Sequence, residues 1–386
     1  MSVNMNRREI LKGSLVGLAA LGIPVSALPA LAQEETVVPF LDFPANFNPN
    51  PGAGRRFFDT RKINNFITPA DEFYTFQHNG QPQLDPATYK LRITGLFDKP
   101  AEFSLDQIKA MRSIEQVVAW ECGGNGPRNN AQGMVSNGKF KGVNLATILK
   151  QCGLTADAKE IVFYAADSFM EDVTHGRGTQ HVDKSYFARS LSADHAMKPE
   201  IMLAYEMNGA PLTLNQGAPL RLITPGWYGV AQVKFLNRIH AQENRFVGKF
   251  MSRDYVTLRS VEDGNETQWL EYTVGPIQLK SVVARVTRTG NAVKIMGFAL
   301  NDLTPIKTVE ISIDGGPWRP ATFDKQNTAT SWKLFNYTWT GATPGEHTIV
   351  SRATDAKGRV QLEKADPTKK TNWENPEQMP RRVMIS

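Results

Sequence analysis

The sequence contains few of the residues that usually build metal and nucleophile sites. It has two cysteines and six histidines in 386 residues, with no CxxC pair and no HxxxH pair. A zinc site made of closely spaced Cys and His ligands is therefore excluded, and so is covalent haem attachment at a CxxCH motif. No run of consecutive Lys and Arg of the kind that binds nucleic acid is present. We expect neither nucleic-acid binding nor haem in this chain.

The first residues have the pattern of an export signal. Arg7 and Arg8 begin a short basic start, residues 14–31 are apolar, and Ala30 and Ala32 supply a small-x-small cleavage site. This length and order indicate a signal peptide over residues 1–32 instead of a permanent membrane span, and the adjacent arginines are typical of the twin-arginine type. We expect a periplasmic protein that is exported folded, as cofactor-containing proteins often are.

The net charge of the mature chain is mildly positive. The total is +6, and removal of Arg7, Arg8, Lys12 and Glu9 with the leader takes away a net +2, which leaves about +4. Such a charge favours an anionic substrate or an acidic partner, although it is also compatible with an ordinary solvated surface.

The remaining chain is long enough for two domains, with a change in composition near Gly275 and Pro276. Residues 33–275 mix extended, strand-like and short helical patterns, including a helix from Leu105 capped by Ser104. Residues 276–386 repeat short alternating strands with turn signals between them, which predicts a β-sandwich of immunoglobulin type. Residues 126–138 and 172–183 have no clear period and are expected to be loops.

Cys122 is the strongest candidate for chemistry. It follows the apolar residues 117–120 and precedes Gly123-Gly124-Asn125-Gly126, so we expect its sulfur at the end of a strand beside free backbone N–H groups. A thiolate there could be a nucleophile, but no histidine lies nearby in the sequence to act as its base. The alternatives are a ligand for a metal that arrives within a cofactor, or a buried cysteine that packs as a small apolar residue.

The residues Trp120-Glu121-Cys122-Gly123-Gly124-Asn125-Gly126 resemble the Cys-(Ala/Ser/Gly)-Gly-Asn signature of the sulfite oxidase family of molybdopterin enzymes, in which that cysteine is the protein ligand to molybdenum. The similarity continues in order through residues 73–78, 203–212, 219–226, 232–236 and 253–255 and covers roughly residues 60 to 360. It implies an α+β fold class: a mixed α/β molybdopterin domain followed by an immunoglobulin-like sandwich that carries the dimer contact.

The resemblance assigns a role to each matched residue. Cys122 is the expected molybdenum ligand, and Tyr255 and Arg128 are the expected catalytic residues. Arg221 and Lys234 suit the pterin phosphate, and Asp167 can accept from the amino groups of the pterin. The full set of expected cofactor-binding residues is Tyr74, Gln77, His78, Asn125, Asp167, Gln216, Arg221, Gln232, Val233 and Lys234.

The implied reaction is oxygen-atom transfer, with sulfite oxidised to sulfate and electrons passed to a separate protein, for which a c-type cytochrome is expected. The sequence departs from the family pattern at the substrate: Phe76 stands where arginine is usual, and Phe140 where tryptophan is usual. An expected arginine is displaced to Arg128, and Arg128, Arg177 or Arg253 could restore the lost charge. A lost charged hydrogen bond costs about 1.5–3 kcal/mol.

Two other functions remain open at this point. The less cationic pocket favours a reductase of S-oxides or N-oxides with the same cofactor, although that branch typically lacks a C-terminal domain. The third candidate is a non-enzymatic exported binding protein, which predicts that no metal is bound.

Overall fold

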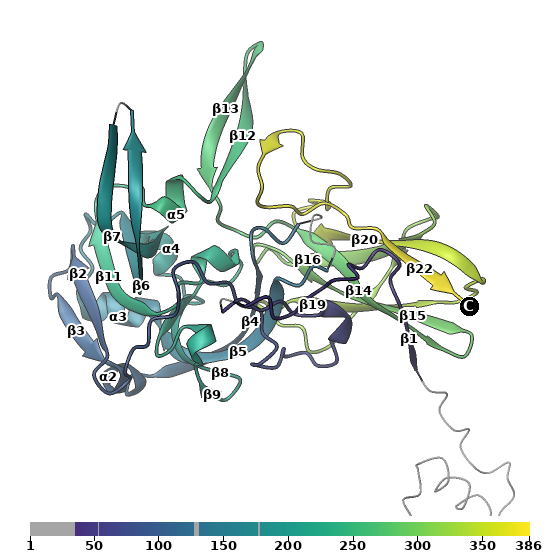
Figure 1. Cartoon of the computed structure of the whole chain (residues 1–386), viewed down its shortest axis with the longest axis horizontal. Coiled ribbons are helices and arrows are strands. Elements are labelled where there is room, and N and C mark those ends of the chain that lie inside the picture. Colours follow the sequence, from purple (N-terminus) through teal and green to yellow (C-terminus); the bar gives the residue numbers. More distant parts are fainter. Residues whose placement is uncertain (1–34, 53, 127–130, 177) are drawn as a thin grey trace, which may run out of the picture.

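The computed structural model describes residues 35–52, 54–126, 131–176 and 178–386. The expected signal peptide, Arg128 and Arg177 therefore lie outside the described residues. Strands make up most of the chain and the helices are short (Figure 1). No helix among the described residues is long and apolar enough to cross a membrane.

Two five-stranded sheets build the first part of the molecule. One has the order β10-β8-β5-β4, with β9 added beside β8, and the other has the order β3-β2-β11-β6-β7. The bounds in the first sheet are β4 Ser113–Glu121, β5 Val135–Asn144, β8 Met202–Met207, β9 Ala210–Pro211 and β10 Arg221–Ile223. In the second sheet they are β2 Lys90–Gly95, β3 Ala101–Ser104, β6 Glu160–His175, β7 Gly178–Ser192 and β11 Leu236–Gln242.

Short helices connect these strands. They are α2 Leu105–Lys109, α3 Leu145–Gln151, α4 Ala193–Ala196 and α5 Lys249–Ser252, with single 3₁₀ turns at η2 Thr60–Lys62, η3 Leu214–Gln216 and η4 Gly229–Ala231. Ser104 caps α2 in the expected way, because its hydroxyl accepts from the Gln107 N–H while the Gln107 side chain accepts from the Ser104 N–H. The start of this helix is therefore specified locally, and the helix ends at Lys109.

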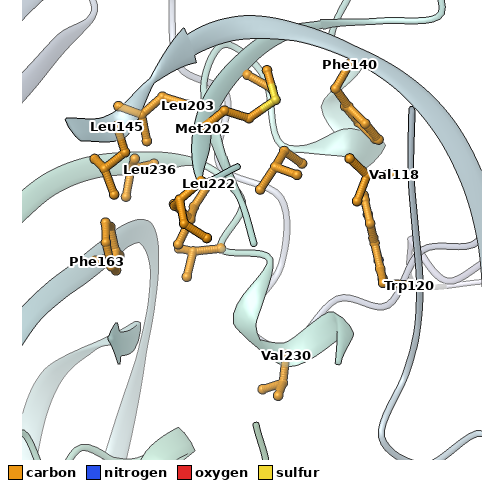
Figure 2. Close-up of a cluster of buried hydrophobic side chains, with 14 of the residues drawn as sticks. Val118, Trp120, Phe140, Leu145, Phe163, Met202, Leu203, Leu222, Val230 and Leu236 are labelled. Carbon is orange, nitrogen blue, oxygen red and sulfur yellow. The ribbon is translucent and has the colours of Figure 1, made fainter. Parts of the chain in front are cut away.

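One large apolar core joins the two sheets. Figure 2 shows part of it, with Trp120 of β4 beside Phe140 of β5 and with Leu222 of β10 facing Leu236 of β11. The ring centroids of Trp120 and Phe140 are 5.3 Å apart, and both side chains are buried. Since β4 leads directly to Cys122, this aromatic packing fixes the end of the strand that carries the candidate metal ligand.

The second part of the molecule is two sheets packed over a shared core. The first has the order β1-β14-β15-β19-β18: β1 Thr36–Val38, β14 Lys280–Thr289, β15 Ala292–Leu300, β19 Lys333–Trp339 and β18 Thr322–Phe323. The second has the order β17-β16-β20-β22: β17 Arg319–Pro320, β16 Ile306–Ile313, β20 Gly345–Asp355 and β22 Arg381–Ile385. Val286 and Ile295 from one sheet and Ile311 and Ile349 from the other lie in the same buried cluster. The immunoglobulin type of this sandwich stays a prediction, as does the boundary at residue 275.

Two long hairpins stand out on the same side of the molecule (Figure 1). One is β6 with β7, and the other pairs β12 Val256–Asp263 with β13 Glu266–Thr273, to which β21 Lys369–Lys370 adds a third strand. The interpretation of residues 172–183 as a loop is wrong, because Asp172 pairs with His181 inside the β6-β7 ladder. The loop expected over residues 126–138 ends early, since β5 begins at Val135. Sheet therefore exceeds the share that the α+β expectation implied.

Candidate active site

Cys122 lies immediately after β4, with its side chain buried and only 8% of the residue exposed. Its N–H donates to the Met134 carbonyl at 2.9 Å, and its own carbonyl accepts from the Asn125 N–H at 3.0 Å. The turn is therefore closed by the backbone itself. Burial raises the pKa of the Cys122 thiol to about 11, while the backbone N–H of Gly124 opposes the shift. A coordinated cation would reverse this preference, because metals bind the thiolate.

A buried ion pair packs against the turn that follows Cys122 and holds it in place. Glu121 and Lys280 are 2% and 3% exposed at their side chains, and the Lys280 Nζ lies 3.0 Å from the Glu121 carboxylate. The Lys280 ammonium also donates to the Asn125 carbonyl at 2.6 Å, and the Asn125 side-chain amide donates to Glu121 at 2.9 Å. Because Lys280 belongs to β14, the C-terminal sheet helps to position the cysteine loop.

The thiol opens into a cavity that several distant segments surround. The space measures about 440 Å³, part of which is open to solvent. Its walls bring together residues from five segments of the chain: Tyr74, Thr75, Phe76, His78, Trp120, Cys122, Asn215, Gln216, Arg221, Gly229, Val230, Gln232, Lys234 and Tyr255. Gly229 is required in this wall, since a Cβ there would collide with the Tyr74 hydroxyl. Eight of the thirteen predicted site residues thus line one cavity: Tyr74, His78, Cys122, Gln216, Arg221, Gln232, Lys234 and Tyr255.

Two cations, the buried Arg221 and the half-buried Lys234, face this cavity without a carboxylate partner among the described residues. Arg221 donates to the carbonyls of Gln216 and Gln232 at 3.0 and 3.1 Å, and its Nε atom has no partner. Lys234 donates to the Phe76 carbonyl at 2.9 Å and to the Gln77 side chain at 2.6 Å. Burial lowers the pKa of Arg221 to about 9 and holds that of Lys234 well below its usual range. Such a pair is strongly stabilised by an incoming anion.

A second hollow adjoins the first and shares Phe76, His78 and Lys234 with it. Gln77 and Asp167 also lie on its wall. Burial raises the pKa of Asp167 to about 6, against the hydrogen bond that it accepts from the Asn79 side chain at 3.2 Å. Asp167, the expected partner of the pterin amino groups, therefore lies on a hollow next to the cavity that Arg221 and Lys234, the expected partners of the phosphate, line.

Aromatic rings enclose the side of the cavity that holds Tyr255. Its hydroxyl lies 2.8 Å from the His78 Nε2, and the His78 ring packs 5.0 Å from each of the Phe187 and Phe250 rings. Burial, with Lys234 and Arg55 nearby, lowers the pKa of His78 to about 4, so the imidazole is neutral at pH 7. This wall offers hydrogen bonds and apolar surface, but His78 brings no positive charge to it.

Two predicted cofactor contacts are set back from the cavity, and a third has a side chain that is already engaged. The Asn125 side chain is used within the cysteine loop, and Val233 is buried behind the wall, where its carbonyl accepts from the Leu222 N–H at 2.8 Å. Gln232 lines the cavity, but its amide group is engaged by Thr224. The roles of these three residues toward a cofactor stay predictions.

The departures from the family pattern have different locations. Phe76 lies on the cavity wall, with the Arg55 guanidinium 4.6 Å above its ring. Phe140 is fully buried and packs against Trp120 and Arg221. It is not among the described residues that line the cavity. Arg253 is held by Glu171 at 3.0 Å and is directed to the β6-β7 hairpin.

Two neighbours of the site were missed by the sequence reasoning. Trp373 stacks on Tyr255 with ring centroids 4.4 Å apart, and its ring would contact a Cβ at Gly124. Arg189 is a buried arginine on β7. Nothing local in the sequence marks either residue, because each reaches the site only through sheet pairing and loop packing.

Comparison with known proteins agrees with this geometry. Residues 78–250 match the family model described as the oxidoreductase molybdopterin binding domain. Mitochondrial sulfite oxidase of Homo sapiens is 28% identical over 334 residues, which cover 78% of this chain and 58% of that protein. Nitrate reductase [NADH] 1 of Arabidopsis thaliana is 28% identical over 307 residues, covering 70% and 32% of the two chains. This chain thus spans little more than half of the sulfite oxidase and about a third of the nitrate reductase.

A solved structure has the same overall fold. The crystal structure of the sulfane dehydrogenase SoxCD from Paracoccus pantotrophus superposes with a TM-score of 0.73 at 22% sequence identity, over 95% of this chain and 96% of that one. The match extends through both parts of the molecule. The alternative of a non-enzymatic binding protein is set aside, because the matched domain and its relatives are oxidoreductases. Residues 78–250 thus match an oxidoreductase molybdopterin binding domain, and the chain is similar over most of its length to sulfite oxidase and shares the fold of the sulfane dehydrogenase.

Proposed function

We propose that the protein catalyses oxygen-atom transfer at a molybdenum cofactor and that its reaction is the oxidation of sulfite to sulfate. One observation carries this proposal: the buried Cys122 thiol, the buried Arg221 and the half-buried Lys234 line one cavity, and neither cation has a carboxylate partner among the described residues. A pterin cofactor presents a soft metal and a phosphate, so the donor set fits both ends of it.

The residues present fit the cofactor on further grounds. The unpartnered Nε of Arg221 is a buried donor that an anion would satisfy. Gln216 and Lys234 border the same space, and Asp167 lies on the adjoining hollow, where its carboxylate can accept from ring amino groups. In this arrangement Cys122 would hold the metal, and Arg221 with Lys234 would hold the phosphate.

The bound cofactor would supply the transferable oxygen atom and accept two electrons. The chain itself would bind and orient the substrate. With the His78 proton on Nε2, the imidazole donates to the Tyr255 oxygen, and the phenol proton is left to donate toward the space beside Cys122. The aromatic wall around His78 excludes water from that side, which strengthens each polar contact to a bound oxyanion.

The electrons would leave to a separate protein, and we propose a c-type cytochrome in the periplasm. The twin-arginine pattern in residues 1–32 supports this location, and the sandwich formed by residues 276–386 would provide the contact of a homodimer.

A second candidate is supported by the cavity wall. Phe76 and a neutral His78 occupy positions where a sulfite site would gain from cations. This arrangement favours reduction of a neutral S-oxide or N-oxide by the same cofactor.

The test is sulfite-dependent reduction of ferricyanide by the purified mature protein, with molybdenum measured per chain in the same sample. Turnover with about one molybdenum per chain is the expected result. Bound molybdenum without turnover, combined with reduction of a sulfoxide by dithionite-reduced protein, would replace sulfite oxidation by the reductase.

A further inference from the structure

Arg189 is an arginine enclosed in the interior behind Tyr255. It lies on β7 and is 1% exposed. Its guanidinium donates to the Phe250 carbonyl, to the Val274 carbonyl at 2.5 Å and to the Thr273 hydroxyl at 3.3 Å. Its Nε has no partner.

The charge of Arg189 is not neutralised locally. No carboxylate among the described residues lies within ion-pair distance of its guanidinium. Burial lowers the pKa of Arg189 to about 10, so the side chain is still a cation at pH 7. A buried cation held only by carbonyl dipoles is costly, and the cost falls when an anion lies within range of its field.

The contacts of Arg189 lead directly to Tyr255. Phe250 and Val274, whose carbonyls it binds, flank the segment that carries Tyr255, and the Val274 N–H donates to the Tyr255 carbonyl at 2.9 Å. The Phe250 ring lies 6.4 Å from the Tyr255 ring and 5.0 Å from the His78 ring. The guanidinium therefore sits behind the aromatic layer that holds the His78–Tyr255 hydrogen bond.

The other arginines that could replace the positive charge missing at Phe76 do not lie behind Tyr255. Arg253 is paired with Glu171, and Phe76 stands where the family resemblance expects an arginine. Arg55 stacks on Phe76 but is exposed to solvent, where its field is screened.

We propose that Arg189 is a positioning residue for an oxyanion substrate: it fixes Tyr255 through Phe250 and Val274 and supplies, from behind the wall, positive charge that Phe76 does not. This inference rests on the proposed sulfite oxidation. It predicts that removal of the charge weakens substrate binding more than turnover.

The experiment compares holoenzyme variants Arg189→Met, which loses the charge, and Arg189→Lys, which keeps it. Arg382→Gln is the control for loss of one positive charge, since Arg382 is exposed and pairs with Glu346 on β20. We expect Arg189→Met to raise the KM for sulfite about tenfold, with kcat changed less than about threefold, and Arg189→Lys to stay within about threefold of wild type in both constants. Equal losses in the Met and Lys variants would overturn the charge role, as would a tenfold rise of KM in Arg189→Lys if the Met variant does not fold.

A second readout separates this inference from the proposed function. Sulfate is added to each holoenzyme and the melting temperature is followed. Sulfate should raise the Tm of wild type, Arg189→Lys and Arg382→Gln, and raise that of Arg189→Met much less. An equal rise in all four proteins would refute the inference even if sulfite is oxidised. A selective loss in Arg189→Met would uphold anion binding even if wild type does not turn over sulfite.

Discussion

The Tyr255 hydroxyl and the His78 Nε2 are 2.8 Å apart, although the two residues are 177 positions apart in the chain. Burial lowers the pKa of His78 to about 4 and moves the pKa of Tyr255 well above its usual value, so both groups are neutral at pH 7. The hydrogen bond therefore joins a neutral phenol to a neutral imidazole, and it orients the Tyr255 hydroxyl.

Substitution Tyr255→Phe should therefore slow the reaction without emptying the site. The loss of one oriented donor is expected to lower kcat/KM by about tenfold to a hundredfold. Molybdenum per chain should be unchanged, because Tyr255 does not hold the metal in our proposal. Steady-state kinetics with metal analysis tests both points, and a wild-type rate would remove Tyr255 from the catalytic residues.

Replacing each of the two cysteines by serine should have different effects: one substitution should reduce turnover and the other should reduce stability. Cys122→Ser is expected to reduce turnover by at least about a hundredfold, since an alcohol is a poorer ligand for a soft metal than a thiolate. Cys152 is buried at the end of α3, and Cys152→Ser is expected to lower the free energy of unfolding by about 1–3 kcal/mol and to leave the specific activity intact. Activity per folded chain, with urea denaturation, distinguishes the two; equal activity losses would contradict the assignment.

Breaking the buried pair beneath the cysteine loop should be expensive. Glu121→Gln leaves Lys280 as an isolated buried cation, which is expected to cost about 3–5 kcal/mol of stability. Because Lys280 also binds the Asn125 carbonyl, the loop around Cys122 should loosen, and molybdenum per chain should fall. Lys139→Gln, which removes an exposed partner of Glu115, is the control and should cost less than about 1 kcal/mol. A change for Glu121→Gln as small as that for the control would contradict this role.

The pair formed by the buried His347 and the half-exposed Asp314 predicts a pH dependence of stability. The Asp314 hydrogen bond raises the pKa of His347, whose other ring nitrogen faces the Thr343 carbonyl. A histidine with a raised folded pKa adds stability that is complete below its unfolded value of about 6.5 and is lost as pH rises through the folded value. The stability difference between wild type and His347→Gln should thus shrink from pH 6 to pH 8.

The size of this effect is limited by solvent. The Asp314 side chain is 49% exposed, so the difference should be less than about 1 kcal/mol. Denaturation series at pH 6, 7 and 8 measure it. A difference that grows with pH would show that the hydrogen bond does not favour the charged imidazole.

Local patterns predicted the elements that depend on local chemistry. The capping box at Ser104 specifies α2, and alternation over residues 292–300 predicts β15 with the observed bounds. The hairpin over residues 172–183 was missed because its residues are mostly polar and exposed, with Val173 buried as an exception, so hydrophobic alternation gives little signal and the strands are specified by the ladder between β6 and β7. Helices are also scarcer than the α+β expectation implied.

The candidate site shows the same division. Residues carried by sequence motifs, such as Cys122, Arg221 and Lys234, do meet in one cavity. Trp373 and Arg189 could not be found this way, since their neighbours Tyr255, Phe250 and Val274 are distant in sequence or carry no motif. Contacts between distant strands and loops bring these side chains to the site, and a sequence motif does not show such contacts.

The N-terminal arm constrains the order in which the molecule can be completed. Thr36 of β1 pairs with Arg288 of β14, a separation of 252 residues, and Phe40 bridges to Val383 near the C-terminus. Closing so long a loop carries an entropic cost that is repaid only after both partner strands exist. The first strand of the described chain can therefore join its sheet only after β14 has formed, and the bridge from Phe40 to the other sheet must wait for β22.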